Sequence, residues 1–130
     1  MSIKGADIRN IAVIGHSGEG KTSVVEAILF NGGTTDRLGK VTDGNTVTDC
    51  DEQEIARKMS ISLSMAYTMW DGVKLKLLDV PGFYDFEGEE NEALRAAGGA
   101  LIVTGATGTL TVGAEKAIDK CLKNKIPMVV

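Results

Sequence analysis

The sequence predicts an α/β fold with a mostly parallel sheet, and three observations support this prediction. An apolar run at residues 11–14 precedes a glycine-rich loop, and apolar residues at helical spacing follow that loop. Residues 60–69 alternate with a period of two and lead into the turn signal Asp71-Gly72. Further along, short apolar runs alternate with helical stripes. Strands that alternate with helices in this way are typical of parallel sheets.

The glycine-rich loop carries the clearest chemical signal. Residues 15–22 read Gly-His-Ser-Gly-Glu-Gly-Lys-Thr, which matches the phosphate-binding pattern G-x-x-x-x-G-K-[ST]. Such a loop points backbone N–H groups at phosphate oxygens, and the following helix adds its partial positive charge. We expect Lys21 to reach the β- and γ-phosphates and the Thr22 hydroxyl to bind Mg²⁺. The nucleotide-binding residues predicted here are Gly15, His16, Ser17, Gly18, Glu19, Gly20, Lys21, Thr22 and Ser23.

A glycine-rich turn with a chance Lys-Thr is the alternative, and the flanking strand and helix disfavour it. His16 is the one histidine in the sequence. Its position inside the loop favours a role in shaping the loop over a role as general base.

Length, charge and cysteine content limit the class of protein. The 130 residues suit one domain, and the net charge of −4 argues against strong nucleic-acid binding by this chain alone. Cys50 and Cys121 lie far apart and match no metal-binding spacing, so we expect Cys121 to be a buried thiol on a helix. No apolar run is long enough to span a membrane. We expect no membrane contact, a cytoplasmic location in keeping with the free thiols, and a monomer.

The first half of the chain has a strand at residues 8–14 and a helix from Lys21 to Phe30, which Asn31-Gly32-Gly33 ends. Residues 34–58 are polar and show no period, which predicts a functional or disordered loop. Its acidic residues lack the central glycine and the spacing of a calcium loop, so we interpret them as a solvated loop. They are Asp49, Asp51, Glu52 and Glu54.

The second strand shows two distinct faces. Large residues form one face, namely Ile61, Leu63, Met65, Tyr67 and Met69, and small residues form the other, namely Ser60, Ser62, Ser64, Ala66 and Thr68. This pattern predicts a half-buried strand paired antiparallel with its neighbour. Asp71-Gly72 predicts a type I′ hairpin turn, so the third strand runs from Val73 to Leu78.

The later elements alternate between helix and strand. We expect a helix at 89–97, a strand at 100–103 and a strand at 126–130. Between the two strands lies a helix whose apolar stripe is Ala114, Ala117, Ile118, Cys121 and Leu122. A chain that ends inside a core strand looks like part of something longer.

A second chemical group follows the third strand, at Asp79-Val80-Pro81-Gly82. An acid at the carboxyl end of an apolar strand, downstream of a phosphate loop, is expected to hold Mg²⁺ through water. Gly82 lets a backbone N–H approach the γ-phosphate because it has no side chain. The hydroxyl of Ser60 is a third candidate, as a Mg²⁺ ligand. A solvated basic turn at residues 57–60 explains the same residues equally well.

These residues together resemble the start of the GTP-binding domain of elongation factor G, and more narrowly an elongation-factor-G-like branch of translational GTPases. The similar stretches are residues 15–22, 49–62, 79–86 and 89–130. Residues 51–54 with Arg57 resemble the first switch of that family, and residues 79–86 resemble the second.

The resemblance implies a P-loop GTPase-type three-layer fold with strand order 2-3-1-4-5, in which strand two is antiparallel. It implies GTP or GDP and Mg²⁺ as ligands, the ribosome as partner, and a ribosomal step such as translocation. Residues 1–130 would be a G domain truncated at its C-terminal end. Lys21 and Gly82 would take the catalytic positions, and Thr22, Ser60 and Asp79 would hold the metal.

The chain departs from this family at four positions. Ser60 replaces a threonine and keeps the hydroxyl, Lys58 replaces a usual glycine, and Gly18 replaces an aspartate. Phe83 replaces the histidine that positions the attacking water, so the resemblance implies GTP binding with slow hydrolysis. Two alternatives stay open. One is a nucleotide-sensing module with little hydrolysis. The other is an ATP-using P-loop protein, because the guanine-reading segment of such domains lies beyond Val130.

Overall fold

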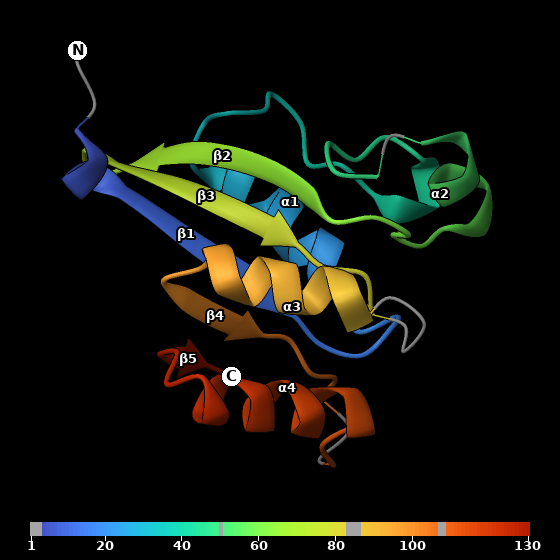
Figure 1. The fold of residues 1–130 in the computed structure, drawn as a ribbon. Coiled ribbons are helices and arrows are strands. Elements are labelled where there is room, and N and C mark those ends of the chain that lie inside the picture. The colour runs from blue at the N-terminus through green and yellow to red at the C-terminus, as the bar shows by residue number, and fades with distance from the viewer. Residues whose placement is uncertain (1–3, 50, 83–86, 107–108) are drawn as a thin grey trace.

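The computed structural model describes residues 4–49, 51–82, 87–106 and 109–130. It is a three-layer α/β fold, with one five-stranded sheet between helices (Figure 1). The strands are β1 Ile8–Ile14, β2 Ser64–Trp70, β3 Val73–Asp79, β4 Gly99–Ile102 and β5 Met128–Val129. The helices are α1 Lys21–Asn31, α2 Glu52–Arg57, α3 Glu87–Ala96 and α4 Val112–Lys123, with short 3₁₀ turns at Gly5–Asp7 and Val41–Asp43.

The sheet has the order β2-β3-β1-β4-β5, as the family resemblance implies. Strand β1 is parallel to β3 and to β4, and β4 is parallel to β5. Of these five strands, β2 alone runs antiparallel to its neighbour, paired with β3 from Ser64 opposite Asp79 to Trp70 opposite Val73. The parallel strands β1, β3 and β4 therefore end at the same edge, and the loop before α1 leaves from that edge.

Two apolar clusters pack on opposite faces of the sheet. On one face, Val13 and Leu77 meet Val25 and Leu29 of α1. On the other face, residues of β1, β3 and β4 meet α3 and α4. Successive residues of a strand point to opposite faces. Val13 therefore contacts α1, while Ala12 and Ile14 contact the other layer.

Strand β2 buries its small face and exposes its large one. Ala66 is 7% exposed and Thr68 is 0% exposed, whereas Met65 is 61% and Tyr67 is 52% exposed. Helix α1 requires this orientation, because a Cβ on Gly32 at its C-terminal end would collide with the Thr68 side chain. Only small residues on β2 allow the helix to approach so closely.

The hairpin between β2 and β3 has the predicted turn. Asp71 has φ 48° and Gly72 has φ 78°, which are the positive values that a type I′ turn requires at both central positions. The strand itself begins at Ser64, so residues 60–63 are not part of it. This start corrects the prediction of a strand from about residue 60.

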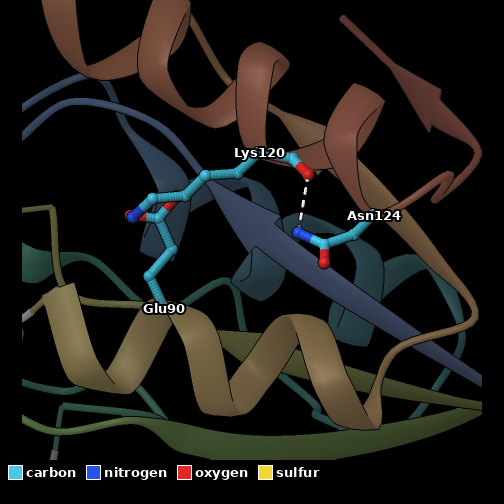
Figure 2. A network of polar contacts seen from close by, with 3 residues as sticks. All are labelled: Glu90, Lys120 and Asn124. Carbon is cyan, nitrogen blue, oxygen red and sulfur yellow. Dashed lines mark hydrogen bonds and ion pairs between the residues drawn. The ribbon is translucent and has the colours of Figure 1, made fainter.

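Helices α3 and α4 are joined by polar contacts as well as by the apolar cluster (Figure 2). The Lys120 ammonium of α4 lies 3.1 Å from the Glu90 carboxylate of α3. Asn124 donates a side-chain hydrogen bond of 2.8 Å to the Lys120 carbonyl at the end of α4. Within α4, Cys121 is fully buried as predicted. Leu122 is 62% exposed, so it does not belong to the buried stripe.

The polar stretch at 34–58 contains more structure than its sequence predicts. It holds the 3₁₀ turn Val41–Asp43 and helix α2, which lies beyond the end of the sheet toward which β3 points (Figure 1). Asp51 caps α2 by accepting from the Gln53 N–H at 2.8 Å. Asp51 and Glu52 are exposed to solvent, as the solvated-loop interpretation predicts, although Glu52 lies in α2 and not in a loop. That interpretation is wrong for Asp49 and Glu54, which are only 4% and 3% exposed.

Among the residues that the structure describes, no helix is both long enough and apolar enough to cross a membrane.

Candidate phosphate-binding site

The loop at residues 15–20 joins the end of β1 to the start of α1, as the motif requires. Its backbone is fixed by side chains from within the loop and the first turn of α1. The His16 N–H donates to Glu19 Oε2 at 3.0 Å, and the Lys21 ammonium donates to the His16 carbonyl at 2.8 Å. The backbone of His16 is therefore part of the framework that gives the loop its shape.

Lys21 is a buried cation at the base of this loop, with 6% of its surface exposed. Burial lowers the pKa of the Lys21 ammonium, and the nearby carboxylates of Asp79 and Glu19 act in the opposite direction. A cation that has already lost most of its water is well prepared to bind an anion.

Gly82 brings the segment after β3 against this loop. A Cβ at Gly82 would collide with the Lys21 ammonium and would lie 2.6 Å from the Ser17 nitrogen. Only glycine allows the two segments to approach this closely. The structure thus places the backbone of Gly82 beside Lys21, where the sequence predicts it.

Asp79 ends β3 and is completely buried. Its Oδ2 accepts hydrogen bonds from the hydroxyls of Thr22, at 2.8 Å, and Thr48, at 2.9 Å. Its Oδ1 is buried and has no hydrogen-bond partner among the described residues. Burial raises the pKa of Asp79 to about 6, although the two hydroxyl donors oppose that rise.

Ser60 lies next to Thr22, and their hydroxyl oxygens are 3.2 Å apart. The Ser60 hydroxyl donates to Asp49 Oδ1 at 2.6 Å. The four side chains therefore form a continuous row, from Asp79 through Thr22 and Ser60 to Asp49. This row favours the functional interpretation of Ser60 over a solvated turn.

Asp49 and Thr48 are site residues that the sequence analysis missed. Asp49 Oδ2 is buried without a hydrogen-bond partner in the described part of the chain, and burial raises the pKa of this carboxyl while the Ser60 hydroxyl opposes the rise. No local pattern marks either residue, because Thr48 contacts Asp79 across 31 positions.

A hollow of about 220 Å³ opens between the loop, the 3₁₀ turn at Val41–Asp43 and the segment that follows this turn. The residues that line it are Ser17, Gly18, Gly20, Lys21, Thr22, Ser23, Val41, Asp49, Lys58, Met59, Ser60 and Gly82. Asp79 contacts Thr22 from outside the hollow. Gly15, His16 and Glu19 are also absent from the lining, and the contact between His16 and Glu19 shapes the loop. Phe83 lies outside the described residues.

Two buried glutamates hold the segment that supplies Ser60 and Asp49. Glu54 of α2 accepts three backbone N–H groups, from Asp51 at 3.3 Å, Ile61 at 2.9 Å and Ser62 at 3.2 Å. Glu26 of α1 accepts the Val47 N–H at 2.5 Å. Both ends of the stretch from residue 47 to 62 are therefore tied to buried carboxylates.

Within the described part of the chain, no three His, Cys, Asp or Glu side chains group as a metal site would require. The site holds instead two carboxylates, Asp49 and Asp79, with the hydroxyls of Thr22, Thr48 and Ser60. Oxygen ligands of this kind suit a hard cation such as Mg²⁺, which keeps several waters and uses few protein ligands.

Comparison with known proteins agrees with this geometry. The family model described as elongation factor Tu GTP binding domain matches residues 6–130. The elongation factor G-like protein of Mycobacterium tuberculosis is 39% identical over 123 residues, which cover 95% of this chain and 17% of that protein. The mitochondrial ribosome-releasing factor 2 of Drosophila willistoni is 38% identical over 125 residues, which cover 96% of this chain and 17% of that protein.

A similar fold is also known from a crystal structure. A protein of Thermus thermophilus superposes with a TM-score of 0.85 at 37% identity, over 92% of this chain and 18% of that one. The chain thus spans about a sixth of the length of the curated relatives it matches.

Proposed function

Because this chain belongs to the family of the elongation factor Tu GTP-binding domain, we propose that it binds GTP and GDP at residues 15–23. The similarity to elongation factor G-like proteins, which the motifs predict, is confirmed. We further propose that residues 1–130 are the N-terminal part of a G domain in a longer translational GTPase.

The observation that carries this proposal is the meeting of three segments at one hollow. The loop supplies Lys21, the exit from β3 supplies the Gly82 backbone, and the segment after α2 supplies Ser60. A polyphosphate needs backbone donors, a cation and hydroxyl groups for its metal. All three kinds of group line the same space.

The residues present also fit a Mg²⁺ ion. The Thr22 and Ser60 hydroxyls each donate their proton to a carboxylate, Asp79 and Asp49 respectively. Their oxygens lie 3.2 Å apart, within hydrogen-bond distance, and each keeps lone pairs that a cation can use. Neighbouring ligands of an octahedral Mg²⁺ lie about 3 Å apart, so this pair suits the ion. The buried oxygens Oδ1 of Asp79 and Oδ2 of Asp49 lack partners among the described residues and are available to its bound waters.

When bound, Mg²⁺ would neutralise charge on the phosphates. We propose that Thr22 and Ser60 ligate it directly, while Asp79 acts through water. Lys21 and the Gly82 N–H would hold the γ-phosphate. These roles extend the sequence prediction by one residue, Asp49, whose carboxylate fixes the orientation of the Ser60 hydroxyl.

Hydrolysis is the finer part of the proposal. The family of this chain supports a GTP hydrolase, and the sequence carries Phe83 where a water-positioning histidine is usual. An apolar side chain cannot orient the attacking water by hydrogen bonding. We propose slow hydrolysis with nucleotide binding retained, which keeps a nucleotide-sensing module as the second candidate function.

The proposed partner of the intact protein is the ribosome. Two relatives are named elongation factor G-like protein and ribosome-releasing factor 2, and these names support a ribosomal step without distinguishing translocation from another. The cytoplasm as its compartment and the monomeric state stay predictions of the sequence.

Calorimetry and single-turnover kinetics on the intact protein test the proposal. We expect a GTP analogue and GDP to bind with Mg²⁺, and ATP to bind much more weakly. Equal binding of ATP would favour the ATP-using alternative. We expect GTP turnover to be slow and to rise in Phe83→His when ribosomes are present. If wild type already turns over as fast as Phe83→His, Phe83 is no handicap. No turnover in either protein, with GTP bound, would favour the sensing module.

A further inference from the structure

Lys58 occupies an unusual position beside the phosphate-binding hollow. It is the first residue after α2, and it lines the hollow together with Ser17, Gly18 and Lys21. Among the described residues that line this space, Lys21 and Lys58 carry the positive charges. The two lysines come from segments far apart in the sequence.

The backbone of Lys58 is left-handed, with φ 54° and ψ 41°. This conformation is unfavourable for a residue with a side chain, and glycine is the usual choice at the end of a helix. A non-glycine residue in such a region often has a functional reason. The unfavourable backbone of Lys58, at the edge of the hollow, therefore points to a function for its side chain.

Both the backbone carbonyl and the side-chain carboxylate of Glu54 stabilise the turn that carries Lys58. The N–H of Lys58 donates to the Ile55 carbonyl at 3.3 Å, and the N–H of Met59 donates to the Glu54 carbonyl at 3.2 Å. The Glu54 carboxylate then accepts the N–H groups of Ile61 and Ser62. Lys58 therefore has a fixed attachment point at the edge of the hollow, two residues before Ser60.

The balance of charges around the hollow favours a second cation next to a bound phosphate. Lys21 is already engaged by the His16 carbonyl and by the nearby Asp79 and Glu19. The side chain of Lys58 makes no hydrogen bond or ion pair with the described part of the chain, and it stays exposed to solvent. A terminal phosphate brings close to two negative charges near neutral pH. Lys21 alone does not balance them beside the carboxylates of Asp49 and Asp79.

We propose that Lys58 contacts the terminal phosphate of a bound nucleoside triphosphate and thereby favours the triphosphate over the diphosphate. This inference rests on the proposed nucleotide binding at residues 15–23. The competing explanation is purely local, because a cation at the C-terminal end of a helix also interacts with the helix dipole. The two explanations differ in what the loss of the charge does to nucleotide affinity.

Lys58→Gln in the intact protein removes the charge and keeps a long polar side chain on the same backbone. We expect affinity for a non-hydrolysable GTP analogue with Mg²⁺ to fall about tenfold, as for the loss of one charge-assisted hydrogen bond. Affinity for GDP is expected to stay within about twofold of wild type, because GDP lacks the phosphate that Lys58 contacts. Lys58→Arg keeps a cation and should retain the preference for the triphosphate.

Lys125 provides the matched control. It is an exposed lysine with the same φ of 54°, located just after α4 and outside the residues that line the hollow. Lys125→Gln should leave the affinities for both nucleotides unchanged. Calorimetry with each nucleotide and a thermal melt of each variant give all the required values.

Wild-type affinity of Lys58→Gln for both nucleotides would overturn the inference, and so would an equal loss for both. Absence of nucleotide binding by wild type would overturn the proposed function itself, and the inference with it. That outcome is distinct, because wild type itself would then bind neither nucleotide.

Discussion

The loop at residues 15–23 and the segment at residues 34–63 line the same hollow but are held in different ways. The backbone of the loop is held by local contacts: the His16 N–H reaches Glu19 three positions away, and Lys21 reaches the His16 carbonyl five positions away. Its one long contact to β3 comes from the Thr22 hydroxyl, which reaches Asp79 across 57 positions. The segment depends on distant contacts, such as Val47 to Glu26 across 21 positions and Thr48 to Asp79 across 31.

The loop at residues 15–23 is therefore the rigid half of the site. The segment at residues 34–63 is the conditional half, because its order depends on contacts with other elements. The loop is fixed by its own strand and helix, so its shape does not depend on the opposite wall. The segment is ordered by a few buried side chains, so the loss of one of them releases many backbone groups. Elements that respond to a bound phosphate are drawn from such weakly anchored regions.

The largest expected effect is on the rigid half. Lys21→Ala removes the buried cation that we expect to contact two phosphates, so nucleotide affinity should fall roughly a thousandfold, or about 4 kcal/mol. The fold should persist, because Lys21 belongs to neither of the two apolar clusters. Calorimetry with GDP and a thermal melt on the intact protein measure both effects.

Lys123→Ala is the control, because Lys123 is an exposed lysine at the end of α4. It should bind nucleotide as wild type does. A folded Lys21→Ala protein with unchanged affinity would disprove the phosphate-loop assignment.

The next effect breaks the conditional half alone. Glu54→Ala removes the acceptor of the Asp51, Ile61 and Ser62 N–H groups. Leaving these three partly buried donors without partners should cost about 3 kcal/mol in the local stability of this segment. Hydrogen exchange should become faster at Ile61 and Ser62, while amides of β1 and α1 keep their protection.

Glu52→Ala changes an exposed glutamate on the same helix and is the matched control for that experiment. It should leave exchange at Ile61 and Ser62 unchanged. If Glu54→Ala accelerated exchange in β1 as strongly as at Ile61, the two halves would unfold as one unit and the contrast between them would be wrong.

The same contrast explains which parts of the structure were predictable. The hairpin and the phosphate-binding loop follow from local patterns in the sequence, because each depends on neighbours within a few residues. The strand order pairs segments that are far apart along the chain, so it follows from the resemblance to a known family instead. The sequence pattern does not predict which face of β2 is buried, because the close approach of Gly32 to Thr68 decides it. Met65 and Tyr67 are therefore exposed although they are the larger side chains.

Helix α2 was missed because it is short and polar, with six residues. Its one local signal is the capping box. In this motif the Asp51 side chain accepts the backbone N–H of Glu54, and the Glu54 side chain accepts the backbone N–H of Asp51. The burial of Asp49 and Glu54 had no such signal. Their partners lie 11 and 7 or 8 positions away, in Ser60, Ile61 and Ser62.

Asp79 connects the two halves, and its pKa predicts a pH dependence. Its folded-state pKa is raised from 3.8 to about 6, so the native state binds more protons than the unfolded state between these values. Stability of the protein without Mg²⁺ and nucleotide should therefore fall as the pH rises from about 4 to about 6. The change attributable to Asp79 is of order 2 kcal/mol.

Thermal melts at several pH values in the presence of a chelator measure this slope. Asp79→Asn keeps an acceptor for the Thr22 and Thr48 hydroxyls but cannot titrate, so its slope should be smaller. The carboxyl of Asp49 is shifted in the same direction by burial, and we expect it to supply the remaining slope. An identical slope in wild type and Asp79→Asn would show that Asp79 is not protonated in this range.

The smallest expected effect on stability comes from residues 34 and 35, where the segment begins after α1. The Thr34 hydroxyl donates to Thr68 Oγ1 on β2 at 2.8 Å, and Thr68 is completely buried. The neighbouring Thr35 hydroxyl is buried without a partner among the described residues. Thr34→Ala should therefore destabilise the protein by about 1 kcal/mol, whereas Thr35→Ala should cost almost nothing, because no hydrogen bond is lost. Denaturant unfolding of both variants measures the difference. Equal losses would mean that the contact between Thr34 and Thr68 does not anchor the segment, and that its order begins at Glu26 and Val47 instead.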